Sequence, residues 1–172
     1  MAIEVGPIPD PIRAGIAGGW QVFHAGELKE NTVVECDVVI VGTGAGGGTA
    51  AEILTQAGLK VVMLEEGPLR SSNDFKMREV EAFRDLYQEG AARTTGDGSM
   101  TLLQGRAVGG STTVNWTSSF RTPPLTLKHW RDVHGVKGIS DAEMAPWFDR
   151  AEQRQKVGPW TVSPNENNDS IR

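Results

Sequence analysis

The sequence has a single cysteine and no long apolar run, and each shortage excludes a class of protein. Cys36 cannot form an intrachain disulfide, which excludes a disulfide-dense secreted scaffold and is compatible with a reducing compartment. No apolar stretch approaches the roughly 18 residues of a membrane-spanning helix. The first residues show neither the basic nor the apolar region of a signal peptide. We therefore expect a cytoplasmic protein, with no indication of membrane association.

Positive charge and histidine are also scarce. There are 17 basic and 22 acidic residues, for a net charge of -5, and no basic stripe, so we expect no nucleic-acid partner. Three scattered histidines and one cysteine do not form a metal-ligand pattern, and no metal site is predicted. A length of 172 residues suffices for one ordinary globular domain. It is short for an enzyme that must hold a cofactor and also shape a substrate pocket.

Glycine, by contrast, is abundant, and many of the 21 glycines gather in two clusters. Before the first cluster, Asp37–Val41 is a run of β-branched residues, typical of a strand buried on both faces of a parallel sheet. After it, residues 49–57 have apolar side chains at helical spacing and end at Gly58. Val61–Leu64 then repeats the strand pattern. Strand, helix and strand within about 30 residues form a β-α-β unit, so the fold class is α/β.

The rest of the chain predicts further elements. A short helix is expected near Ile12–Trp20 of the N-terminal arm, which we expect to pack onto the body through Trp20, Val22 and Phe23. An amphipathic helix with Met77, Val80, Phe83 and Tyr87 on one face, a short strand and a second helix are expected over 75–89, 100–103 and 126–134. Ser140 and Glu143 have capping-box spacing. Pro146 predicts a break and a restarted helix up to about 156, burying Trp147, Phe148 and Ala151.

The first glycine cluster, Gly42-Thr43-Gly44-Ala45-Gly46-Gly47, fits G-x-G-x-x-G between a predicted strand and a predicted helix. In that pattern Gly42 permits a tight turn, Gly44 lets a pyrophosphate approach the backbone, and Gly47 allows close packing of helix on strand. The pyrophosphate then lies at the helix N-terminus, where N–H groups and the helix dipole favour an anion. The alternative interpretation is a flexible turn without a ligand.

An acidic residue follows the second strand, where such units bind ribose hydroxyls. Glu65 ends the apolar run directly and is preferred over Glu66. A carboxylate at this position disfavours a 2′-phosphate, so the pattern predicts NAD or FAD rather than NADP. A solvated carboxylate at the end of a strand is the alternative.

The second cluster distinguishes between these cofactors. It reads Gly105-Arg106-Ala107-Val108-Gly109-Gly110-Ser111-Thr112-Thr113-Val114-Asn115-Trp116. A Gly-Gly pair followed by three hydroxyl residues offers backbone and side-chain donors to a phosphate or to the polar edge of a flavin. A surface turn rich in glycine and serine is the other interpretation.

This segment resembles the signature of the glucose-methanol-choline (GMC) oxidoreductases, FAD enzymes that oxidise alcohols. That signature runs Gly-Arg-x-aliphatic-Gly-Gly, small residues, then aliphatic-Asn, and residues 105–115 match it. The stretch 61–67, ending Leu-Glu-Glu-Gly, is similar to the second strand of the family. The resemblance covers residues 35–160, and the segment after Val114 is more similar to the branch with long-chain alcohol oxidases. Two departures are Trp116, where glycine is common, and Ser119, where an aromatic residue is common.

The resemblance implies a Rossmann-like FAD-binding β-α-β unit with additional helices, incomplete relative to the full family fold. Residues 1–34 would form an arm and residues 35–172 the N-terminal part of the FAD-binding domain, without the substrate domain and the C-terminal catalytic part. FAD would be bound non-covalently, because no histidine lies in or near the second segment. The resemblance places cofactor contacts at Gly42, Thr43, Gly44, Ala45 and Gly47 for the pyrophosphate, Glu65 for the ribose, and Arg106, Gly110, Ser111, Asn115, Trp116 and Thr117 along the pyrophosphate–isoalloxazine side. An ion-pairing surface role is the alternative for Arg106.

No catalytic residue is assigned, because the family's catalytic histidine lies late in a much longer chain. His129 and His134 belong to a predicted amphipathic helix and match nothing in that role. We expect the FAD-binding portion of an oxidoreductase acting on the CH-OH group of alcohols, inactive alone, with the remainder of a longer polypeptide as partner. An NAD-dependent dehydrogenase fragment would leave residues 105–115 unexplained. A non-catalytic dinucleotide-binding module is the third hypothesis.

Overall fold

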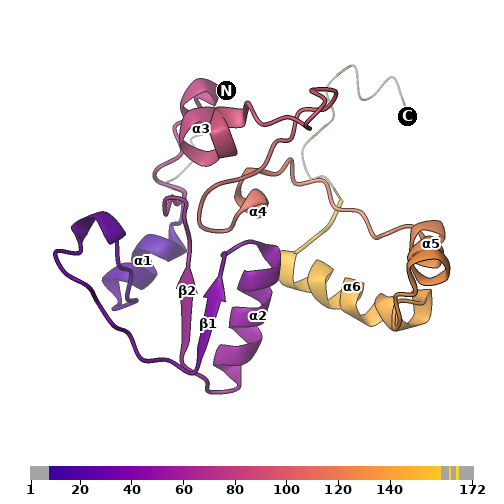
Figure 1. The fold of residues 1–172 in the computed structure, drawn as a ribbon, viewed down its shortest axis with the longest axis horizontal. Coiled ribbons are helices and arrows are strands. Elements are labelled where there is room, and N and C mark those ends of the chain that lie inside the picture. The colour runs from indigo at the N-terminus through magenta and orange to yellow at the C-terminus, as the bar shows by residue number, and fades with distance from the viewer. Residues whose placement is uncertain (1–7, 160–162, 164–165, 167–172) are drawn as a thin grey trace. The chain divides into compact units, whose positions relative to one another are not determined.

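The computed structural model describes residues 8–159 together with Ser163 and Glu166 (Figure 1). The chain divides into two compact units, residues 1–116 and residues 117–172. Within the described residues no helix is long and apolar enough to cross a membrane.

The centre of the first unit is the predicted β-α-β unit. Strand β1 (Val38–Val41) and strand β2 (Val61–Leu64) are parallel, with Val38 opposite Val61 and Val41 opposite Leu64. Helix α2 (Ala45–Gln56) connects them and lies beside both strands (Figure 1). Gly58 has a φ of 86°, which turns the chain back towards β2 after α2. The strand–helix–strand prediction is therefore confirmed.

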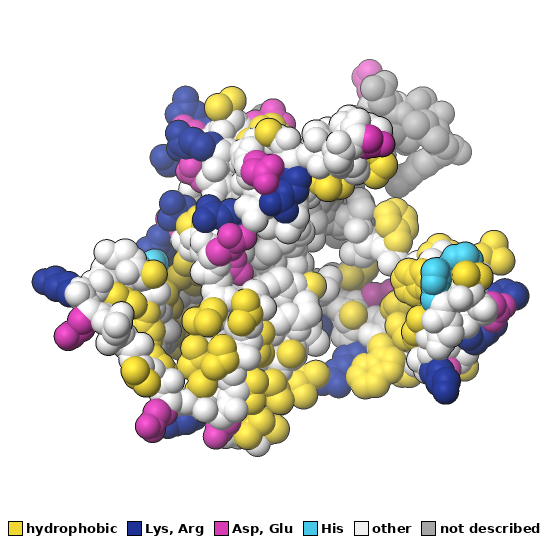
Figure 2. Space-filling view, viewed as in Figure 1, with side chains coloured by type: hydrophobic (Ala, Val, Ile, Leu, Met, Phe, Trp, Pro, Cys, Tyr) yellow, Lys and Arg dark blue, Asp and Glu magenta, His cyan; other side chains and the backbone are white. Residues whose placement is uncertain are grey.

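The prediction that both strands are buried on two faces is wrong for this chain. An added Cβ on Gly47 of α2 would lie 3.2 Å from Ile40, so Ile40 faces the helix. Its strand neighbours face the other way, and Val39 and Val41 are 53% and 84% exposed. Hydrophobic side chains are visible across this part of the surface (Figure 2). A parallel sheet normally has both faces covered, and here one helix covers one face of two strands.

The N-terminal arm contains α1 (Pro11–Ala17) and the short 3-10 helix η1 (Ala25–Glu27). The expected helix is present but ends three residues earlier than the sequence indicated. The predicted apolar anchor is wrong, because the side chains of Trp20, Val22 and Phe23 are exposed. The ring of Trp20 instead folds back on Gly15, where an added Cβ would lie 2.5 Å from it. Polar contacts attach the arm to the rest of the unit.

Helix α3 (Glu79–Leu86) is shorter than the predicted 75–89 helix. Met77 precedes it with a φ of 54° and is 96% exposed, and Val80 is 83% exposed, so neither belongs to a buried helical face. After α3 come the 3-10 helix η2 (Gln88–Ala91) and a loop in which Thr94 and Thr101 form an isolated antiparallel bridge. The predicted strand 100–103 is thus reduced to a single bridge. Helix α4 (Ser111–Val114) closes the unit.

The second unit consists of α5 (Pro124–His134) and α6 (Asp141–Gln155). The predicted helix 126–134 is present as α5, which starts two residues earlier and ends at His134, followed by Gly135 in the left-handed conformation. The capping box of Ser140 and Glu143 is present and starts α6, which continues through Pro146. The predicted break is therefore wrong: Pro146 removes one backbone hydrogen bond, but α6 continues to Gln155.

The apolar face expected for α6 is also largely open. Trp147 is 59% exposed and Ala151 is exposed. Phe148 is half-buried beneath the Arg121 guanidinium, which lies 5.8 Å from the ring centre. The hydrophobic core of the described residues is small: Leu86 and Ala107 are buried in the first unit, and Leu127 is buried in the second.

Candidate functional site

The glycine loop between β1 and α2 has the geometry that its sequence predicts. Gly42 has a φ of 91° and donates from its N–H to the Leu64 carbonyl at 2.7 Å. An added Cβ on Gly47 would lie 2.1 Å from the Gly42 carbonyl oxygen, so only glycine allows this packing. An added Cβ on Gly44 would meet nothing within 4 Å. The three glycines therefore supply a turn, a close helix–strand contact and an open approach to the backbone.

The open approach lies at the start of a helix. Gly44 is the N-cap of α2, and Ala45 is its first residue. The N–H groups in the first turn of a helix have no partner within the helix, and the helix dipole adds partial positive charge there. The site can therefore accept a diphosphate without a basic side chain.

Glu65 links the loop to the end of β2. Its carboxylate accepts from the Thr43 hydroxyl at 2.6 Å, from the Thr43 N–H at 2.9 Å and from the Gly67 N–H at 2.9 Å. Partial burial disfavours the charged form, but these hydrogen bonds outweigh it and hold the pKa of the Glu65 carboxyl below its ordinary value. An ionised carboxylate only accepts hydrogen bonds, which suits the hydroxyl donors of a ribose.

The second glycine segment packs directly on the first. The Gly109 N–H donates to the Thr43 hydroxyl oxygen at 3.0 Å, across 66 positions of sequence. An added Cβ on Gly110 would lie 2.9 Å from the Gly44 Cα. The Thr43 hydroxyl therefore accepts from one glycine segment and donates to Glu65. The structure brings the predicted pyrophosphate loop, the predicted ribose acid and Gly110 into one site.

Gly67 is a residue of this site that sequence reasoning did not single out. An added Cβ there would lie 2.4 Å from the Ala107 nitrogen, and Ala107 is fully buried. The Val108 N–H donates to the Pro68 carbonyl at 3.1 Å beside it. The available signal was the glycine that closes the Leu-Glu-Glu-Gly stretch, where β2 ends and the second segment must approach closely.

Two residues of the second glycine segment that were predicted to contact the cofactor, Ser111 and Arg106, also make hydrogen bonds within the protein. The Ser111 hydroxyl accepts from the Gly105 N–H at 3.0 Å and closes the second loop. The Arg106 guanidinium lies 3.5 Å from the Glu66 carboxylate and donates to the Glu66 carbonyl at 3.3 Å. The structure thus shows Arg106 in an ion pair, which was the alternative to a cofactor contact for this residue.

A cavity of about 610 Å³ lies in the first unit, between the segment before α3 and the end of α4. Asn115 lines it, so this predicted residue faces a space large enough for a ligand. The Tyr87 hydroxyl donates to the Val114 carbonyl at 3.2 Å and joins the two walls. The Trp116 side chain is 83% exposed, and Thr117 begins the second unit with a φ of 58°.

The histidines form no part of this site. His129 and His134 contact each other on α5, with ring centres 5.2 Å apart. No histidine lines the cavity beside Asn115 among the residues that the structure describes. The same residues contain no group of three or more metal-ligating side chains.

A glycine loop at a helix N-terminus, with a carboxylate at the end of the next strand, defines a dinucleotide-binding β-α-β unit. Residues 37–76 match the FAD binding domain, and residues 83–172, more than half of the chain, match the GMC oxidoreductase family. The chain belongs to the GMC oxidoreductase family.

Individual relatives agree with that assignment. Long-chain-alcohol oxidase FAO4B of Arabidopsis thaliana is 40% identical over 139 residues, which is 81% of this chain and 19% of the relative. A GMC-type oxidoreductase of Mycobacterium tuberculosis is 39% identical over 131 residues, 74% of this chain and 21% of the relative. An oxygen-dependent choline dehydrogenase of Yersinia pseudotuberculosis is 27% identical over 136 residues, 73% of this chain and 24% of the relative. The chain spans about a fifth of the length of the first two.

Alanine at two glycines of the first loop is expected to destabilise the fold to very different extents. Gly47→Ala would push its methyl group against the Gly42 carbonyl and lower the free energy of unfolding by about 1–3 kcal/mol or more. Gly44→Ala adds a methyl group in open space and should change the free energy of unfolding by no more than about 1 kcal/mol. Urea unfolding followed by circular dichroism measures both. Equal destabilisation by the two variants would contradict the packing described for Gly47.

The stabilising contribution of Glu65 is expected to disappear in acid. Because the folded state lowers the pKa of this carboxyl below 4.5, its contribution is complete above that value and is lost as the pH falls through the folded pKa. The difference in unfolding free energy between the unmodified chain and Glu65→Gln should therefore narrow from about pH 6 to about pH 3. Denaturant titrations across that range measure it. A difference that stays constant would show that the carboxylate charge does not hold the loop.

Proposed function

We propose that the chain binds FAD non-covalently and serves as the cofactor-holding portion of an oxidoreductase that acts on the CH-OH group of alcohols. The observation that supports FAD most directly is the contact between the two glycine segments, made by the Gly109 N–H and the Thr43 hydroxyl. A unit for NAD needs only the first segment. The second segment adds backbone and hydroxyl groups next to the open loop, where the longer flavin cofactor needs them.

The residues would divide the cofactor between them. The start of α2 at Ala45 would hold the pyrophosphate, and Glu65 would accept from the adenosine ribose. The open space beside Gly44 leaves room for the phosphates, because an added Cβ there meets nothing. Gly110 and Asn115 would lie towards the isoalloxazine ring. The bound flavin supplies a hydride acceptor, and the protein positions and shields it.

The alcohol substrate is proposed from the relatives, whose names include long-chain-alcohol oxidases and a choline dehydrogenase. The cavity beside Asn115 has no histidine in its described lining, so a general base of the family type would have to come from elsewhere. The exposed valines of β1 support packing by another part of a longer protein. We propose that the 172-residue chain alone does not turn over alcohols.

Titration of the purified chain with FAD, followed by quenching of flavin fluorescence, tests the cofactor. We expect FAD to bind more tightly than NAD. Gly44→Ala should weaken FAD binding by about tenfold or more, because its methyl group occupies the approach to the pyrophosphate. Gly96→Ala is the matched control. Its added Cβ also has no atom within 4 Å, and Gly96 lies in the loop after α3, outside the glycine loop.

Three outcomes would contradict the proposal. Equal or tighter binding of NAD would favour a dehydrogenase fragment of another class. Unchanged FAD affinity in Gly44→Ala would place the cofactor elsewhere. Alcohol-dependent dye reduction by the isolated chain would show that it contains the catalytic groups after all.

A further inference from the structure

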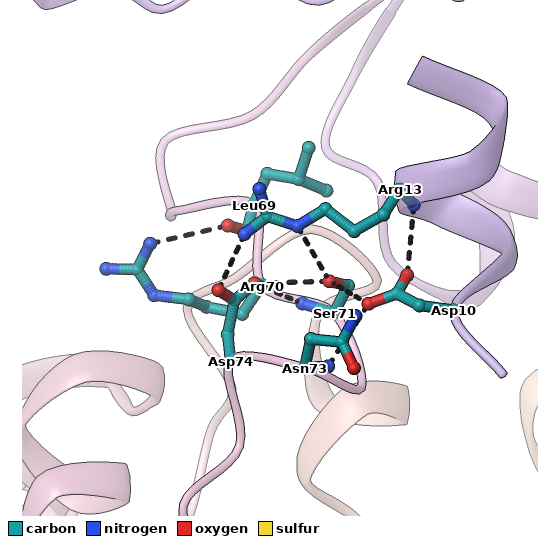
Figure 3. Close-up of polar contacts among 7 residues, drawn as sticks. All are labelled: Asp10, Arg13, Leu69, Arg70, Ser71, Asn73 and Asp74. Atoms are coloured by element: carbon teal, nitrogen blue, oxygen red, sulfur yellow. Dashed lines mark hydrogen bonds and ion pairs between the residues drawn. The ribbon is translucent and has the colours of Figure 1, made fainter. Parts of the chain in front are cut away.

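A polar cluster joins the N-terminal arm to the segment after β2 (Figure 3). We call it the arm clamp, and it consists of Asp10, Arg13, Ser71, Asn73 and Asp74. Neither family match includes residues before 37, so two of its members lie outside the matched regions. The clamp is therefore an addition to the dinucleotide-binding unit itself.

The hydroxyl of Ser71 is at the centre of the clamp. Ser71 is 3% exposed, and its hydroxyl donates to the Asp10 carboxylate at 2.7 Å and accepts from the Arg13 guanidinium at 3.3 Å. Figure 3 shows both side chains reaching it from the arm. The same hydroxyl lies 3.2 Å from the Asp74 carboxylate of its own turn, so the arm supplies two of its three polar contacts.

The Asp10 carboxylate accepts hydrogen bonds both from its own arm and from the turn after β2. One carboxylate oxygen accepts from the Arg13 N–H at 2.9 Å and caps α1. The other accepts from Ser71 and from the Asn73 N–H at 3.1 Å. The start of α1 and the conformation of the 71–74 turn therefore depend on the same side chain.

The ion pair between Arg13 and Asp74 contributes less. Its atoms are 2.6 Å apart, but the two side chains are 56% and 23% exposed, and exposed pairs stabilise weakly. Asp74 also accepts from the Ser71 N–H at 2.9 Å and so braces the turn from within. The directional hydrogen bonds to Ser71 and Asn73, rather than the ion pair, define the geometry.

The clamped turn is also a wall of the cavity described above. Asn73, Asp74 and Phe75 line the cavity on one side, and Thr113 to Asn115 line it on the other. Met77, two residues after Phe75, is exposed and has a positive φ. Residues 73–75 belong to a loop and lack the repeated backbone hydrogen bonds of a helix or strand. The arm clamp supplies hydrogen bonds to this loop instead.

We propose that Asp10 and Arg13 are positioning residues that hold the cavity wall formed by residues 73–75. The arm thus determines the shape of the cavity beside Asn115 through the 71–74 turn. This role is independent of which dinucleotide binds at the glycine loop.

Hydrogen exchange measured by mass spectrometry on the ligand-free 172-residue chain tests the proposal. Asp10→Asn keeps a good helix cap but places an amide group where the Asn73 N–H needs an acceptor. Ser71→Ala removes the central hydroxyl with little change in volume, and serves if the first variant folds poorly. Both should speed exchange in residues 71–82 by about tenfold, while β1 and β2 keep their protection.

Asp97→Asn is the matched control, because Asp97 accepts from Thr95 and Ser99 in a loop of the same unit that does not line the cavity. It should affect exchange only near residues 94–101. Unchanged exchange of residues 71–82 in both clamp variants would overturn the proposal. Equal loss of protection in β1 and β2 would also overturn it, since the clamp would then stabilise the unit in general rather than position the wall.

Discussion

The site depends on the hydroxyl group of Thr43. It donates to Glu65 at the end of β2 and accepts from the Gly109 N–H of the second glycine segment. Around it, glycines at 47, 67 and 110 allow backbone contacts that any Cβ would prevent. A dinucleotide site needs backbone donors that are already in place, because ordering loops on binding costs free energy. Here the ordering results from contacts between three loops that lie far apart in the sequence.

The sequence correctly predicted the features that depend on residues close together in the chain. The strand, helix and strand follow from side-chain periodicity, and the role of Gly47 follows from the packing of α2 on β1. The contact between Gly109 and Thr43 could not be deduced from spacing, because a 66-residue separation permits many arrangements. The functional link between the two segments followed from the resemblance to a family, and in the structure the Gly109 N–H and the Thr43 hydroxyl make the contact.

The failed predictions have a common origin. A local sequence pattern does not record which other parts of the chain pack against a residue in the fold. A continuous run of valine and isoleucine indicated a doubly buried strand, yet Val41 is 84% exposed because one helix covers only one face. Pro146 indicated a break, yet α6 runs without interruption from Asp141 to Gln155. Aromatic residues in the arm indicated apolar anchoring, yet the arm is held through the hydroxyl of Ser71. For the strand and the arm, partners distant in sequence or space decided the outcome.

The most direct test of this account is the set of backbone amides whose NMR chemical shifts change when FAD is added to the isotopically labelled chain. We predict shifts in both glycine segments together, residues 42–47 and 105–115, with Glu65 and Gly67 between them. NAD should perturb chiefly the first segment. Shifts confined to residues 42–47 with FAD, and the same with NAD, would contradict the claim that the two segments form one flavin site.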